Sequence, residues 1–84
     1  MIKHALYLGD YLFEVTFYDQ TVRVVNLEPF FAQKHPVIHK FANPELVKNF
    51  HLEDGTLCWG DNELDVNPLN LYTGKYDAQP EYVH

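Results

Sequence analysis

Apolar and polar side chains alternate from Phe13 to Val24, with an interruption at Asp19-Gln20. A period of two is typical of strands that bury one face. A two-residue turn at Asp19-Gln20 then pairs Phe17 with Val22 across an antiparallel hairpin. In that register the core face holds Phe13, Val15, Phe17, Val22 and Val24, and the outer face holds Glu14, Thr16, Arg23 and Val25.

Two further features define this first hairpin. Gln20 is unfavourable where a tight turn requires a positive φ, so a bulged turn is the alternative geometry. The segment Ala5–Leu8 predicts a short strand that precedes the hairpin and ends at a Gly9-Asp10 turn.

A second hairpin is predicted around Asp54-Gly55, a strong signal for a tight turn. It sets Leu52 opposite Leu57 on the apolar face and His51 opposite Cys58 on the other face. Phe50 then lies opposite Trp59, so we expect Trp59 to belong to the core rather than to a binding edge.

Helices are predicted to be short and capped. Asn43-Pro44 and Asn67-Pro68 each place a capping side chain before a proline at the first helical position. Pro36–Phe41 is a further candidate. The fold class is therefore α+β, an antiparallel sheet of two hairpins plus an N-terminal strand, with two or three short helices packed on one face. We expect one domain over residues 1–74 and a loosely attached tail over residues 75–84.

Composition narrows the function classes. The 84 residues carry a net charge of −6 and a single arginine, Arg23, which makes nucleic-acid binding unlikely. No apolar run approaches the ~20 residues of a membrane span. Cys58 is the single cysteine and cannot form an intramolecular disulfide. Together these features favour a protein of the cytoplasm.

The order and spacing of several short motifs resemble one known family. The first half matches at Phe17-x-Asp19, Val22-Arg23 and Leu27-x-Pro29-Phe30. The second half matches at Phe50, Asp54-Gly55-Thr56-Leu57-x-Trp59, Asp65, Pro68 and Leu71-Tyr72. The family is the prokaryotic domain of unknown function 2442. The chain departs from its usual pattern at Gln20, Glu28 and Gly60.

This resemblance implies an α+β fold with an antiparallel sheet and short helices, and it implies no established activity. Some members resemble components of small toxin–antitoxin-like gene pairs. Longer members carry a helix-turn-helix domain, which this sequence does not extend to, so DNA binding is not carried over. Within the motifs, Trp59 and Asp65 mark a loop of candidate functional interest.

Candidate chemistry is sparse. His35 and His39 are four residues apart, but Pro36 lies between them and a metal site needs three or four ligands. His51 with Cys58 lacks an orienting group and an oxyanion site. The acidic loop of Asp61, Glu63 and Asp65 lacks a calcium-loop pattern. We therefore expect no enzyme, no cofactor and no metal centre.

Two function classes remain. The first is a non-enzymatic protein-interaction module that binds an unidentified partner, or itself, through the outer sheet face or a strand edge. Its candidate interface is Tyr7, Tyr11, Tyr18, Arg23 and Val25. The alternative is a ligand- or metal-binding domain that uses the histidines and the acidic loop.

Overall fold

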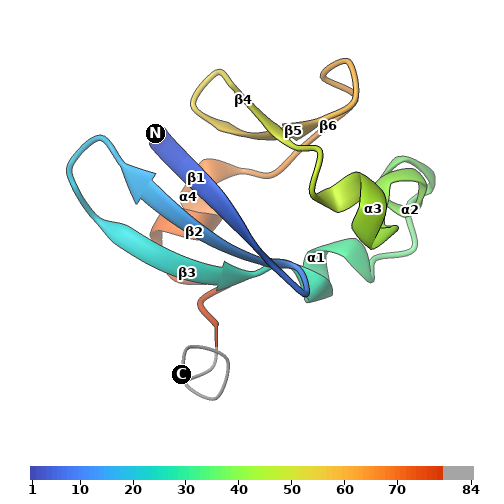
Figure 1. The fold of residues 1–84 in the computed structure, drawn as a ribbon, viewed down its shortest axis with the longest axis horizontal. Helices are drawn as coiled ribbons and strands as arrows, with labels where there is room; N and C mark the ends of the chain where they lie inside the picture. The colour runs from blue at the N-terminus through green and yellow to red at the C-terminus, as the bar shows by residue number, and fades with distance from the viewer. Residues whose placement is uncertain (79–84) are drawn as a thin grey trace.

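The computed structural model describes residues 1–78, so the last part of the predicted tail, residues 79–84, lies outside the described residues. Six strands and four short helices occur within them (Figure 1). In chain order they are β1 (Ile2–Gly9), β2 (Leu12–Phe17), β3 (Val22–Asn26), α1 (Glu28–Phe31), α2 (Pro36–Phe41), α3 (Pro44–Val47), β4 (His51–Glu53), β5 (Thr56–Trp59), β6 (Leu64–Asp65) and α4 (Pro68–Tyr72).

The strands form two antiparallel sheets of three strands each, in the orders β1-β2-β3 and β4-β5-β6. The α+β class is thus confirmed, although the two hairpins belong to separate sheets rather than to one. The sheets meet where the Ile2 N–H donates to the Gly55 carbonyl oxygen at 2.8 Å. The predicted pairings of Leu52 with Leu57 and of His51 with Cys58 are confirmed.

The predicted register between β2 and β3 is wrong by one residue. Val22 lies opposite Thr16, and Phe17 instead exchanges backbone hydrogen bonds with Thr21 and Gln20. The loop therefore has three residues, with Gln20 at a φ of 76°, which is the bulged alternative. Because side chains alternate along a strand, the extra loop residue exchanges the two faces of β3. Val25 is consequently buried and Val22 is 56% exposed.

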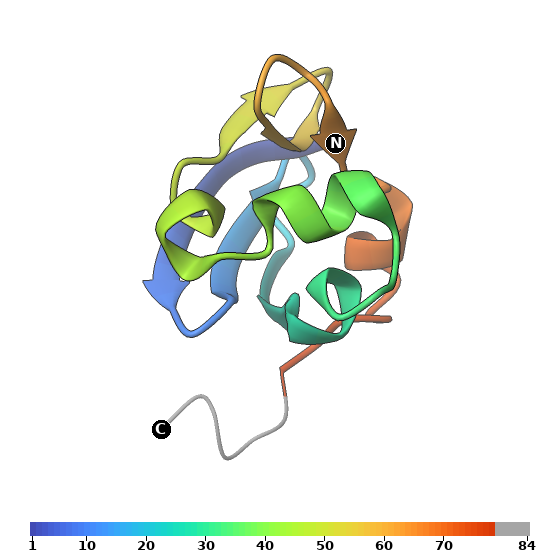
Figure 2. The ribbon, with the colours of Figure 1, turned by 90° about the vertical axis from the view of Figure 1, so that its right-hand side faces the viewer.

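Helix starts follow the predicted caps. The Asn43 side chain accepts a hydrogen bond from the Glu45 N–H, and the Asn67 side chain accepts one from the Leu69 N–H. Helices α1, α2 and α3 gather at the end of the first sheet where the β1–β2 turn lies, and α4 lies behind that sheet (Figures 1 and 2). No helix among residues 1–78 is long and apolar enough to cross a bilayer.

Trp59 occupies the centre of the core, as expected, and is fully buried. Its ring packs edge-on against Phe31 at 5.1 Å and against Phe13 at 6.2 Å between centroids. Its Nε1–H donates to the Val47 carbonyl oxygen at 2.9 Å. This bond satisfies the indole donor inside the core and ties α3 to β5.

The segment after Gly74 is attached to the domain as far as Ala78. The Tyr76 carbonyl accepts a hydrogen bond from the Asn26 N–H, and the Ala78 N–H donates to the Val24 carbonyl. Arg23 forms an ion pair with Asp77 at 2.8 Å. The loosely attached tail was expected to begin at Lys75, but these contacts pair residues 76–78 with the outer edge of β3.

Candidate functional site

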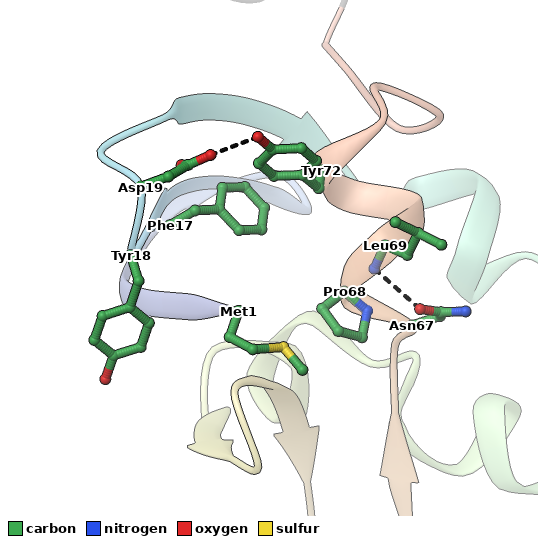
Figure 3. A pocket seen from close by; sticks show the side chains of 8 residues that line it. All are labelled: Met1, Phe17, Tyr18, Asp19, Asn67, Pro68, Leu69 and Tyr72. Carbon is green, nitrogen blue, oxygen red and sulfur yellow. Dashed lines mark hydrogen bonds between the residues drawn. The ribbon is translucent and has the colours of Figure 1, made fainter.

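A groove of about 520 Å³ lies between the tip of the β2–β3 hairpin and helix α4 (Figure 3). The hairpin contributes Phe17, Tyr18 and Asp19, the helix and its cap contribute Asn67, Pro68, Leu69 and Tyr72, and Met1 completes the lining. Two segments that are about fifty residues apart in the chain thus form its opposite walls.

The groove has a buried floor and exposed apolar walls. Phe17 is buried, and its ring meets Tyr72 edge-on with centroids 5.0 Å apart. Met1, Tyr18 and Leu69 are each more than 60% exposed. Residues 1–78 contain eight exposed large apolar side chains, of which Met1, Tyr18, Leu69 and Tyr72 line this groove. Such a concentration marks a surface suited to contact with another molecule.

A hydrogen-bonded carboxylate sits at the rim of the groove. The Tyr72 hydroxyl donates to Asp19 Oδ2 at 2.5 Å, and the Thr21 N–H donates to Asp19 Oδ1 at 3.0 Å. The bond from Tyr72, followed by those from Thr21, lowers the pKa of Asp19 from 3.8 to about 2, and the amino group of Met1 contributes least. Asp19 is therefore ionised at neutral pH.

Among the described residues that line the groove there is no serine, cysteine, lysine or histidine. Nucleophilic catalysis needs such a group beside a base, and general acid–base catalysis needs a proton donor or acceptor that titrates near the working pH. Asp19 stays ionised far below that range. What this arrangement offers chemically is apolar contact and a fixed negative charge.

The residues that the sequence suggested as an interface do not form one surface. Tyr7 packs on Phe13 with centroids 4.9 Å apart, and the Tyr11 hydroxyl donates to the Ala42 carbonyl at 2.6 Å. Val25 is in the core, and Arg23 is engaged by Asp77. Tyr18 alone among the five borders the groove.

The outer face of the first sheet carries different side chains from those predicted. Leu6, Leu8 and Val22 are exposed on it. Figure 1 shows no helix of residues 1–78 over the face of this sheet that is turned away from α4. The exchange of faces on β3 explains why Val22 replaces Val25 there. These three exposed apolar side chains lie outside the groove.

The remaining candidates are dispersed. Among the described residues, no three His, Cys, Asp or Glu side chains are placed to hold one metal ion. His51 Nε2 lies 3.0 Å from Asn62 Oδ1. Cys58 is buried, and burial raises the pKa of its thiol, which disfavours the nucleophilic thiolate. Trp59 is in the core, while Asp65 is exposed opposite Cys58.

Sequence reasoning missed Met1, Asp19, Leu69 and Tyr72 as site residues. Leu69 and Tyr72 lie three residues apart on a short helix, a spacing that usually indicates the buried face. Leu71 is the buried residue of that helix instead. A helix of five residues with a proline start has one buried stripe, so the two remaining large apolar side chains had to lie elsewhere.

The architecture of residues 1–78 defines a small α+β domain with two antiparallel sheets and an apolar groove between the β2–β3 hairpin and α4. Residues 2–77 match the model of a family described as a protein of unknown function (DUF2442). The match spans most of the chain, so the chain belongs to this family, as its motifs had suggested. Neither the search of curated proteins nor the search of solved structures returned a match.

Proposed function

We propose that this domain is a protein-interaction module that binds a polypeptide segment of a partner protein in the groove between the β2–β3 hairpin and α4. The observation that carries the proposal is the gathering of Met1, Tyr18, Leu69 and Tyr72 around one concave surface. Large apolar and aromatic side chains grouped in a pocket are typical of the centres of protein interfaces.

A polypeptide segment fits the groove better than an enclosed small molecule does. Sites for small ligands usually bury most of the ligand and hold it with several converging polar groups. Here the walls are largely exposed, and Asp19 and Asn67 are the polar side chains of the lining apart from the tyrosine hydroxyls. The proposed partner is a protein rather than a nucleic acid, because an ionised carboxylate and a net charge of −6 repel phosphates.

A small toxin–antitoxin-like or regulatory pair, which the family resemblance suggested, would supply a partner of this kind. The other function class, ligand or metal binding by the histidines and the acidic loop, gains no support from the dispersed positions of these side chains.

The proposal can be tested by selecting a random library of phage-displayed dodecapeptides on the immobilised domain. We expect enrichment on the wild type and on Leu46→Lys, because Leu46 is an exposed leucine of α3 outside the groove. Leu69→Lys places a charge on the apolar wall and should abolish the enrichment. Selected peptides that bind Leu69→Lys as tightly as the wild type, or a failure to enrich any peptide, would overturn the proposal.

A further inference from the structure

We propose that the segment bound in the groove carries an arginine two residues from a large aliphatic residue, and that Asp19 binds the guanidinium while the aliphatic side chain lies against Met1, Pro68 and Leu69. This inference rests on the proposed function and adds the chemistry of the partner. It follows from the position of the carboxylate at one end of an otherwise apolar groove (Figure 3).

Asp19 is held ready to accept further hydrogen bonds. Each carboxylate oxygen accepts one bond within the domain, Oδ1 from the Thr21 N–H and Oδ2 from the Tyr72 hydroxyl. An ionised carboxylate has about four acceptor positions, so both oxygens retain capacity on the side that faces solvent. The two internal bonds fix the orientation of the group, which lowers the entropy lost when a ligand binds.

The negative charge of the Asp19 carboxylate favours a basic side chain in the bound segment. None of the eight lining residues carries a basic side chain. The Met1 amino group also acts on Asp19, and its effect is weaker than those of Tyr72 and Thr21. The net charge of −6 adds a long-range attraction for a basic segment.

Arginine suits this site better than lysine. Its planar guanidinium can donate two parallel hydrogen bonds to the two oxygens of one carboxylate. It also stacks on aromatic rings, and the exposed ring of Tyr72 borders Asp19 through its hydroxyl. A lysine ammonium offers a point charge without the planar stacking surface.

The other half of the groove accounts for the aliphatic residue. Figure 3 shows Asp19 and the Tyr72 hydroxyl at one edge of the groove, while Met1 and Pro68 lie at the opposite edge. Successive residues of an extended segment rise about 3.3 Å along the backbone, so residues two apart are separated by about 7 Å. One residue can thus reach Asp19 while the next but one contacts the apolar wall, because alternate side chains share a face.

The test uses the same peptide library with a matched pair of charge variants. Asp19→Asn keeps an oxygen for the Thr21 N–H and an amide donor for Tyr72, so it removes the charge and preserves the turn. Asp61→Asn removes one charge from an exposed loop residue outside the groove. We expect arginine to be enriched two residues from Leu, Ile or Met on the wild type and on Asp61→Asn, and not on Asp19→Asn.

A direct measurement follows from the best selected peptide. Replacing its arginine by citrulline, which has the same shape without the charge, should weaken binding to the wild type about tenfold, as expected for a charge-assisted hydrogen bond. The same replacement should leave binding to Asp19→Asn unchanged. Equal effects on both proteins would overturn the inference.

The two proposals fail in distinguishable ways. Apolar peptides without arginine that bind the wild type and Asp19→Asn alike, yet not Leu69→Lys, would overturn the arginine inference and leave the groove as the binding site. If no peptide depends on Leu69, both proposals fall.

Discussion

The Tyr72 hydroxyl donates a hydrogen bond to Asp19 Oδ2 at 2.5 Å, joining α4 to the β2–β3 turn across 53 residues of chain. A hydrogen bond to the ionised form of an acid favours that form. The bond from Tyr72 is accordingly the largest cause of the lowered pKa of Asp19. Since both residues line the groove, this bond also sets the separation of its two walls.

Removing the bond should raise the pKa of Asp19. In Tyr72→Phe we expect the pKa to move from about 2 back toward 3.8, with the bonds from Thr21 retaining part of the shift. The Asp19 carboxyl carbon can be followed by NMR during an acid titration. Tyr18→Phe is the control, because that hydroxyl makes no bond to Asp19. An unchanged pKa in Tyr72→Phe would show that the bond is absent in solution.

The lowered pKa of Asp19 also predicts that the stability of the folded domain depends on pH. The folded state has the lower pKa, so ionised Asp19 stabilises the fold above pH ~4, and this contribution is lost as the pH falls toward 2. Tyr72→Phe should therefore lose less stability than the wild type between pH 5 and pH 2, values that bracket the titration. Urea unfolding at the two pH values measures the difference. A larger loss in Tyr72→Phe would contradict it.

The register of β3 can be tested with two valines of the same strand. Val25 is fully buried, so Val25→Lys should destabilise the domain by about 3–5 kcal/mol through an uncompensated buried charge. Val22 is 56% exposed, and Val22→Lys should change stability by no more than about 0.5 kcal/mol. Urea denaturation measures the free energy of unfolding of both variants. If Val22→Lys were the more destabilised variant, the register with a two-residue turn, as predicted from the sequence, would be supported instead.

These two valines also show what the sequence could specify. Alternation predicted the strands β2 and β3 and the core face of β2, since Phe13, Val15 and Phe17 are all buried. On β3, both faces carry apolar residues, so alternation did not distinguish Val22 and Val24 from Val25. The length of the β2–β3 loop determines which face of β3 is buried, and Asp19-Gln20 contains no glycine that would specify the turn type.

The second hairpin was predictable for the opposite reason. Asp54-Gly55 specifies a two-residue turn, and both residues have positive φ. Its register was therefore correct, as were the asparagine caps of α3 and α4. The groove could not be predicted, because it joins the β2–β3 tip to α4 by tertiary packing that no local pattern encodes.

Gln20 offers a route to a more stable domain. Its φ of 76° is unfavourable for a residue with a side chain, and glycine adopts it without steric cost. Gln20→Gly should therefore stabilise the fold by about 0.5–1 kcal/mol, even with the loss of the exposed bond from its side chain to the Tyr18 carbonyl. Thermal unfolding measures the change.

Gly55→Ala is the reciprocal control for this prediction. Gly55 has the same φ of 76°, and an added Cβ would lie 2.9 Å from the Met1 Cβ. The variant should lose stability where Gln20→Gly gains it. If both variants destabilise the domain, the left-handed conformation of Gln20 is not a source of strain.

Substitution of Trp59 should reduce the stability of the domain more than substitution of any other core residue, because Trp59 is fully buried and also donates a hydrogen bond within the core. Trp59→Phe removes part of a fully buried ring and leaves the Val47 carbonyl without the indole donor. We expect a loss of about 2–4 kcal/mol, a large part of the ~4–12 kcal/mol typical of a domain of this size. Phe50→Leu, at a half-buried position beside Phe13, is the control and should cost less. Circular dichroism during urea unfolding measures both, and equal losses would mean that the bond from Trp59 to Val47 contributes little.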